Sequence, residues 1–91
     1  MADKPENETL LKFPCDFPIK IMGRNEADFA DNMLALVIRH APDFDAASMQ
    51  MRPSSAGKYL SLTCTIRATS KQQLDDLYRE LTAHKQVLMA L

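Results

Sequence analysis

Residues 60–69 alternate between apolar and polar side chains without interruption. The apolar positions fall on one side of an extended chain, and they are Leu60, Leu62, Cys64, Ile66 and Ala68. A period of two residues predicts a β-strand that packs one face on a core and leaves the other face open. This strand therefore predicts a sheet that is covered on one side only.

The remaining apolar pattern predicts five further elements. In chain order they are a strand at 17–22 closed by Gly23, a helix at 26–41 with Asn25 as its N-cap, a strand at 48–52, a helix capped by Ser70 and a strand at 87–91. Polar capping residues and the helix-ending Pro42 support the two helices, in which apolar residues recur at helical spacing. The order is β-α-β-β-α-β.

This order predicts an α+β fold, the ferredoxin-like sandwich. Its four antiparallel strands have the spatial order 4-1-3-2, and both helices lie on one face of the sheet. We expect residues 1–9 to form a disordered tail and residues 10–91 to form a single domain. The predicted core consists of Phe17, Ile19, Ile21, Phe29, Met33, Val37, Leu60, Leu62, Ile66, Leu74, Leu77 and Leu81.

Charge and composition narrow the classes of partner. The 91 residues carry a net charge of -1 with both signs interspersed, whereas a protein that follows nucleic-acid phosphates carries a basic excess. No stretch approaches the ~20 apolar residues of a membrane helix, and the polar N-terminus does not resemble a signal peptide. We therefore expect a cytoplasmic protein, a monomer or weak homodimer, that binds neither nucleic acid nor membrane.

The two cysteines are expected to stay reduced. An antiparallel register with Ile19 opposite Cys64 puts Cys15 four residues further along the strand, on the order of 13 Å away. A disulfide needs Cα atoms within about 7 Å of each other. Cys64 should be buried, and Cys15 should be the more accessible thiol.

Three short segments carry a family resemblance. They are Phe13-Pro14-x-x-Phe17-x-x-Lys20-x-Met22-Gly23, Arg39-His40-Ala41-Pro42 and Pro53-Ser54-Ser55-x-Gly57-x-Tyr59. Together they resemble the YbeD-like family of small bacterial proteins, over residues 11–91. The resemblance implies a fold similar to ACT-type regulatory domains and a regulatory role linked to lipoate, and it brings no catalytic residues.

No arrangement of residues predicts an enzyme, a cofactor or a metal site. Ser54 and Ser55 lack the surroundings of a nucleophile, and the segment Pro53, Ser54, Ser55, Gly57 and Tyr59 is interpreted as a structural hairpin turn. His40 and His84 each fall near the end of a helix, where they complement its dipole. Acylphosphatases share the predicted topology, but the strand at 60–69 lacks the asparagine that they use.

Two binding sites remain as alternatives. In ACT-like domains the turn after the first strand holds the ligand, which here means Gly23, Arg24 and Asn25; a helix N-terminus there favours an anion such as a carboxylate. The second candidate is the open face of the sheet, where the predicted register gathers a polar, locally basic surface of Lys20, Gln50, Arg52, Thr63 and Arg67. The first site predicts a non-catalytic small-molecule sensor, which is the preferred function, and the second predicts, as the alternative, an adaptor that binds a protein partner.

Overall fold

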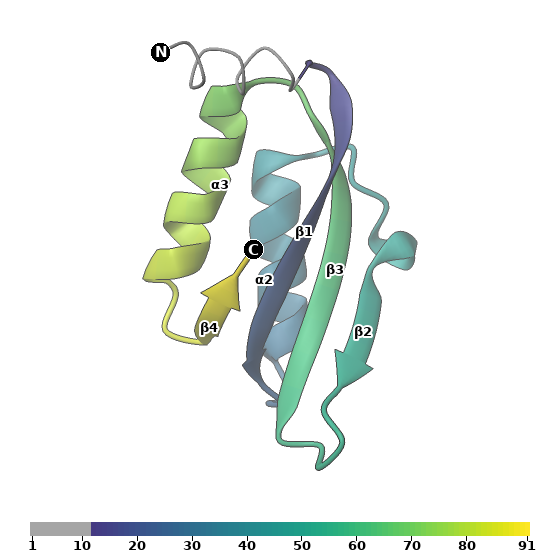
Figure 1. The fold of residues 1–91 in the computed structure, drawn as a ribbon, viewed down its shortest axis with the longest axis vertical. Coiled ribbons are helices and arrows are strands. Elements are labelled where there is room, and N and C mark those ends of the chain that lie inside the picture. The colour runs from purple at the N-terminus through teal and green to yellow at the C-terminus, as the bar shows by residue number, and fades with distance from the viewer. Residues whose placement is uncertain (1–11) are drawn as a thin grey trace, which may run out of the picture.

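The computed structural model describes residues 12–91 and contains one four-stranded sheet and two α-helices. The elements are β1 (Cys15–Arg24), α2 (Phe29–His40), a short 3-10 helix (Ala46–Ser48), β2 (Gln50–Pro53), β3 (Tyr59–Ala68), α3 (Lys71–Ala83) and β4 (Val87–Ala90). The strands are ordered β2-β3-β1-β4 and pair antiparallel. Figure 1 views the sheet from its uncovered side, with α2 behind β1 and β3. The predicted ferredoxin-like fold and strand order are confirmed.

The register between strands agrees with the predicted one. Ile19 lies opposite Cys64 in the β1–β3 pair, and Arg52 lies opposite Ser61 in the β2–β3 pair. Cys15 pairs with Ala68, four positions from Cys64, so both thiols are free, as expected. Cys64 is fully buried, and burial raises the pKa of its thiol to about 11.

The core lies between the sheet and the two helices. Eleven of the twelve predicted core residues are buried; Phe17 is half-buried and packs against the edge of the core. Five further apolar residues are buried: Cys64, as expected, together with Leu36, Ala41, Phe44 and Ala68. The alternating pattern of β3 therefore identifies the buried side of the sheet correctly.

The first helix begins later than predicted. Asp28, not Asn25, is the N-cap of α2. The Asn25 Nδ2 amide donates to the carbonyl oxygen of Gly57 at 3.1 Å, and its backbone N–H donates to the carbonyl of Lys58 at 2.8 Å. Asn25 thus joins the β1–α2 turn to the β2–β3 hairpin, a contact that is distant in sequence. The Ser70 cap of α3 is confirmed, since its hydroxyl accepts from the Gln73 N–H at 3.1 Å.

The strand boundaries also differ from the predicted ones. β1 extends two residues beyond each end of 17–22, so that Gly23 lies within the strand and does not close it. β2 begins at Gln50, because the 3-10 helix at Ala46–Ser48 takes the first predicted strand position. The predicted tail, residues 1–9, lies outside the described residues, and its boundary stays a prediction.

Candidate functional site

The open face of the sheet, the side that no helix covers, gathers four of its five predicted residues. Lys20 of β1, Thr63 of β3 and Gln50 of β2 are register partners across the three strands. Arg52 lies one row away, two residues along β2 from Gln50. These side chains come from three strands and are brought together by the register alone.

Arg67, the fifth predicted residue, lies on the same face of the sheet but toward its other end. It lies four residues along β3 from Thr63, opposite Asp16 of β1. Its guanidinium faces the Asp16 carboxylate at 3.8 Å. The two opposite charges offset each other at that end of the sheet.

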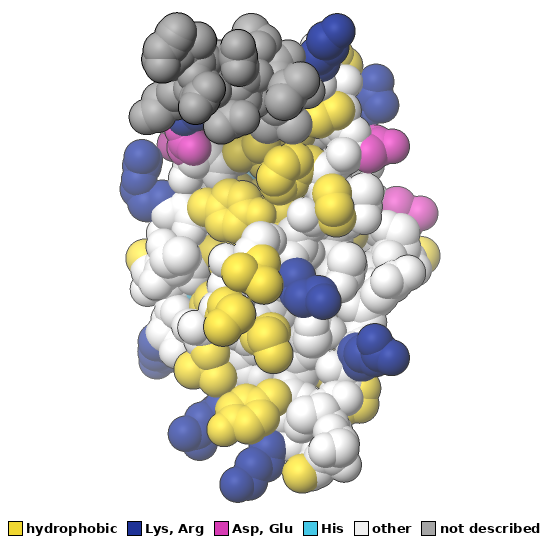
Figure 2. Space-filling view, viewed as in Figure 1, with side chains coloured by type: hydrophobic (Ala, Val, Ile, Leu, Met, Phe, Trp, Pro, Cys, Tyr) yellow, Lys and Arg dark blue, Asp and Glu magenta, His cyan; other side chains and the backbone are white. Residues whose placement is uncertain are grey.

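Four cations on or beside the open face make no ion pair with any residue in the described part of the chain. We call them the basic row, and they are Lys20, Arg24, Arg52 and Lys58. Elsewhere, several basic residues pair with a carboxylate, as in Arg39–Glu80 between the two helices or Lys71–Asp75 on α3, although Lys85 makes no ion pair within the described residues either. In Figure 2, acidic side chains show only toward the upper part of this face.

The open face also carries apolar side chains beside the predicted polar and basic ones. We call them the apolar stripe: Met22, Tyr59, Leu88, Met89 and Leu91. Met89 lies opposite Met22 across the β1–β4 pair, and two backbone hydrogen bonds hold Leu91 beside Lys20. Leu88, Met89 and Leu91 are 58%, 49% and 64% exposed. A band of hydrophobic side chains runs along this face, flanked by Lys and Arg (Figure 2).

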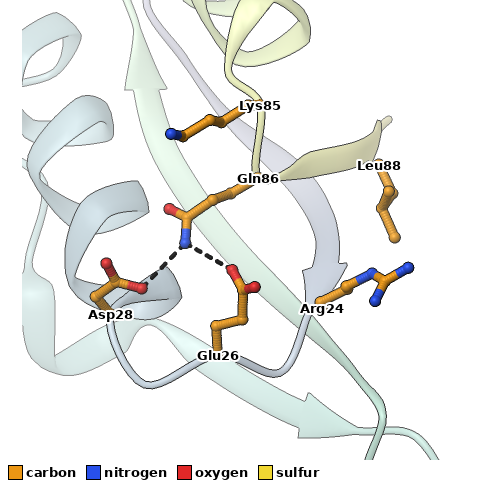
Figure 3. A pocket seen from close by; sticks show the side chains of 6 residues that line it. All are labelled: Arg24, Glu26, Asp28, Lys85, Gln86 and Leu88. Atoms are coloured by element: carbon orange, nitrogen blue, oxygen red, sulfur yellow. Dashed lines mark hydrogen bonds between the residues drawn. The ribbon is translucent and has the colours of Figure 1, made fainter.

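The stripe corrects the predicted description of the face as polar. Residues 87–91 are all apolar, so no alternation in the sequence shows which of them point outward. The structure adds a β-bulge between Met22 and Gly23, where Met22 pairs with Met89 but Gly23 pairs with Val87. Leu88 is the extra residue of this bulge and lies beside Arg24 (Figure 3). The open face is therefore amphipathic, with apolar and basic side chains next to each other.

At the β1–α2 turn, the other predicted site, Gly23 and Asn25 are already occupied by contacts within the protein. Gly23 is buried, and a Cβ atom there would lie 2.4 Å from the Gln86 carbonyl oxygen and 2.6 Å from the Phe29 ring. Close backbone approach at this glycine therefore serves contacts within the protein. The Asn25 N–H and side-chain amide are both hydrogen-bonded to the hairpin. The Arg24 carbonyl accepts a hydrogen bond from the Glu26 N–H at 2.8 Å, whereas its exposed guanidinium makes no ion pair within the described residues.

A hollow of about 700 Å³ opens beside this turn (Figure 3). Its lining contains two cations, two carboxylates, an amide and an apolar side chain: Arg24, Lys85, Glu26, Asp28, Gln86 and Leu88. The Gln86 Nε2 amide donates to Glu26 Oε1 at 2.9 Å and to Asp28 Oδ1 at 3.0 Å. Two carboxylates thus already face the N-terminus of α2, where an anionic ligand was expected.

The hairpin turn between β2 and β3 is held by its own hydrogen bonds. The Ser54 N–H donates to the Tyr59 carbonyl at 2.9 Å, and the Tyr59 N–H donates to the Ser54 hydroxyl at 3.2 Å. Gly57 has a φ of +76°, a conformation that favours glycine. The Ser54 hydroxyl is therefore engaged as an acceptor within the turn.

Residues 12–91 hold neither a cluster of metal-ligating side chains nor a membrane-spanning helix. Within this range, no group of three or more His, Cys, Asp or Glu side chains has the arrangement of a metal site. No helix in the same range combines the length and the apolar character needed to cross a membrane.

The fold and the uncovered sheet define an ACT-like α+β domain. Two solved structures share the fold: protein HP0495 from H. pylori, with a TM-score of 0.71 and 11% identity over 89% of this chain and 85% of that one, and the ACT domain of the GTP pyrophosphokinase from Chlorobium tepidum, with a TM-score of 0.64 and 14% identity over 84% of both chains. At these identities the likeness shows the fold alone.

Sequence comparison identifies the family. Residues 8–91 match the family described as "Protein of unknown function (DUF493)", and the chain belongs to that family. A UPF0250 protein of Ralstonia nicotianae is 52% identical over 96% of this chain and 90% of its own length. One from Bordetella pertussis is 48% identical over the full length of both chains. The resemblance to the YbeD-like family is confirmed.

Proposed function

We propose that this domain is a small non-catalytic regulatory module that binds an acidic protein partner on the open face of its sheet. The observation that carries this proposal is the basic row, because its four cations have no carboxylate partner among the described residues. A partner of opposite charge would gain favourable electrostatic contacts there and would be steered toward the face. The net charge of -1 means that this local excess is not a property of the whole chain.

The candidate nucleophile and the histidine of α2 are both engaged in contacts within the fold, which supports a non-catalytic role. The Ser54 hydroxyl accepts a hydrogen bond inside its turn. His40 Nε2 lies 2.6 Å from Glu80 Oε1 and connects α2 to α3 on the covered side of the sheet. Neither group is arranged with a second one in the manner of a nucleophile and its base.

An NMR titration tests the proposal. Isotope-labelled protein is titrated at low salt with a glutamate-rich peptide, and in parallel with a lysine-rich peptide of the same length. We expect the acidic peptide to shift the amides of Lys20, Arg52 and Thr63, and the basic peptide to leave them unchanged. Shifts confined to the helices, or the absence of any shift at millimolar acidic peptide, would contradict the proposal.

A small-molecule site at the β1–α2 turn is the second candidate. The hollow beside Arg24 and Lys85 favours it, since two cations there could hold a carboxylate. Glu26 and Asp28 line the same hollow and oppose an anion. Lipoate, a carboxylate that the family resemblance implies, is the probe to use. If this candidate holds, lipoate shifts the amides of Gly23, Arg24 and Asn25; unchanged amides at saturating lipoate would remove it.

A further inference from the structure

The apolar stripe and the basic row run side by side on the open face, and together they indicate the shape of a partner. Met22 and Met89 form an apolar pair across β1 and β4. On the same face, Lys20 and Arg24 are four residues apart along β1, on the order of 13 Å at strand rise. Arg52 lies two strands away from Met22. The face thus has apolar side chains over β4 that continue through Met22 of β1 to Tyr59 of β3, and basic side chains that extend from β1 toward β2.

A shallow hollow on this face can receive one side chain of a partner. It measures about 190 Å³ and is bordered by Met22, Tyr59 and Arg52, together with the start of the hairpin turn. A hollow between an aromatic ring and a methionine suits an apolar side chain, and the adjacent guanidinium suits a carboxylate. Anchor and charge contacts would therefore come from neighbouring positions of one partner segment.

On the basis of the proposed function, we infer that the partner segment is an acidic amphipathic α-helix that lies along β1. Two turns of a helix rise about 11 Å, so carboxylates seven residues apart come within reach of both Lys20 and Arg24. Apolar side chains on the adjacent helix face would cover the apolar stripe, as in other complexes where a helix binds through apolar residues at helical spacing. One segment then satisfies both the apolar and the basic side chains of the face.

The structure argues against two other modes of binding. A second copy packed face to face would bring two basic rows together, and like charges at an interface oppose association. Strand addition is hindered at both edges of the sheet. Pro53 lies on the edge strand β2, and Pro18 lies on the part of β1 that β4 does not cover; neither residue has an N–H to donate to an added strand. The uncovered face, rather than an edge, is therefore the docking surface.

Three peptides of about 18 residues, long enough for partial helicity, test the inference on the full-length protein. The first places Glu and Leu on opposite sides of a helix, the second has the same composition in a scrambled, non-amphipathic order, and the third replaces Glu by Lys. Anionic phospholipid vesicles are measured in parallel. We expect calorimetry to give the first peptide an affinity about tenfold or more above the scrambled one, a clearly resolvable difference.

Variants of the stripe separate this inference from the proposed function. Met89→Ser with Leu91→Ser should abolish the advantage of the amphipathic peptide, whereas Ile38→Ser, an exposed apolar residue of α2, should preserve it. Equal binding of both acidic peptides at the open face would overturn the helix and leave the proposed function intact. Absence of binding by either acidic peptide would overturn both. If vesicles bind through the apolar stripe and prevent the peptide from binding, the partner is a membrane surface and the inference of a helical partner is wrong.

Discussion

The two sides of the sheet differ in how completely their side chains are buried by other parts of the protein. On the covered side, the five apolar residues of β3 pack against the helices, and none is more than 8% exposed. On the open side, the register places basic and apolar side chains next to one another without covering them. The covered side meets the requirements of folding, whereas the open side exposes apolar surface that folding alone does not require.

The charges show the same contrast. Arg39, which bridges to Glu80, and Arg79, which lies 3.3 Å from Asp76, belong to the helical layer. Such exposed pairs contribute little to stability, typically about 0–1 kcal/mol. The basic row has no such partners among the described residues. Because unpaired cations next to exposed apolar groups do not stabilise the fold, the difference favours a binding role for the open side.

The largest expected effect is a loss of stability when a side chain on the covered side of the sheet is shortened. Leu62 and Met51 are register partners that point to the same side of the sheet, but Leu62 is fully buried and Met51 is 58% exposed. Replacing Leu62 by Ala should cost about 2–5 kcal/mol in urea-induced unfolding, because it leaves a cavity. Met51→Ala, the matched control, should cost less than about 1 kcal/mol. Similar losses in both variants would show that the covered side is assigned incorrectly.

The buried Cys64 thiol makes the stability of the protein depend on pH. Burial raises the pKa of its thiol from 9.0 to about 11, so between these values the unfolded chain loses the thiol proton while the native state keeps it. Stability should therefore fall as pH rises from about 9 to 11, by up to about 2–3 kcal/mol. Burial also raises the pKa of Tyr78.

The Cys64→Ala variant isolates the contribution of the thiol, because Tyr78 titrates in both proteins. Its unfolding free energy, measured in urea at each pH, should start lower than that of the unmodified protein and decline less between pH 9 and 11. Parallel declines in the two proteins would contradict burial of an uncharged Cys64.

Gly23 lies where the sheet meets the β1–α2 turn, and substituting it tests how tightly that turn is packed. The Gly23→Ala variant should lose about 1–3 kcal/mol and shift the NMR signals of the Phe29 ring, since the added Cβ would clash with that ring. Gly57→Ala has space for a Cβ but a positive φ, so it should lose stability without moving the Phe29 signals. An unchanged Phe29 ring in Gly23→Ala would show that the turn is open enough for a ligand.

Much of the fold could be predicted from local pattern. The alternation along β3 determines which side of the sheet is buried, and a shift by one residue would expose every core side chain of the strand. The register that places Lys20 opposite Thr63 follows from matching the apolar positions of β1 with those of β3. All five residues assigned to the open face therefore lie on it; four of them come together, and Arg67 lies farther along β3, beside Asp16.

The remaining features depend on contacts between distant segments. Asn25 is a favourable N-cap by type, but its side chain bonds to Gly57 in the hairpin, and the helix begins later. The glycine at position 23 is explained by Phe29 and by the carbonyl of Gln86, which is far along the chain. The outward positions of β4 depend on a β-bulge that an entirely apolar segment does not reveal.

Charge reversal on the two sides of the sheet tests the central claim most directly. The variant Lys20→Glu, Arg52→Glu changes the open face, and Arg39→Glu, Arg79→Glu makes the same change in net charge on the helical layer. Affinity for the acidic amphipathic peptide is measured by calorimetry over a series of salt concentrations. We predict that the open-face variant loses about tenfold or more at low salt and has a flatter salt dependence. We predict that the helical variant stays within about threefold. Equal losses in the two variants, or an unchanged affinity in the open-face variant, would contradict the account.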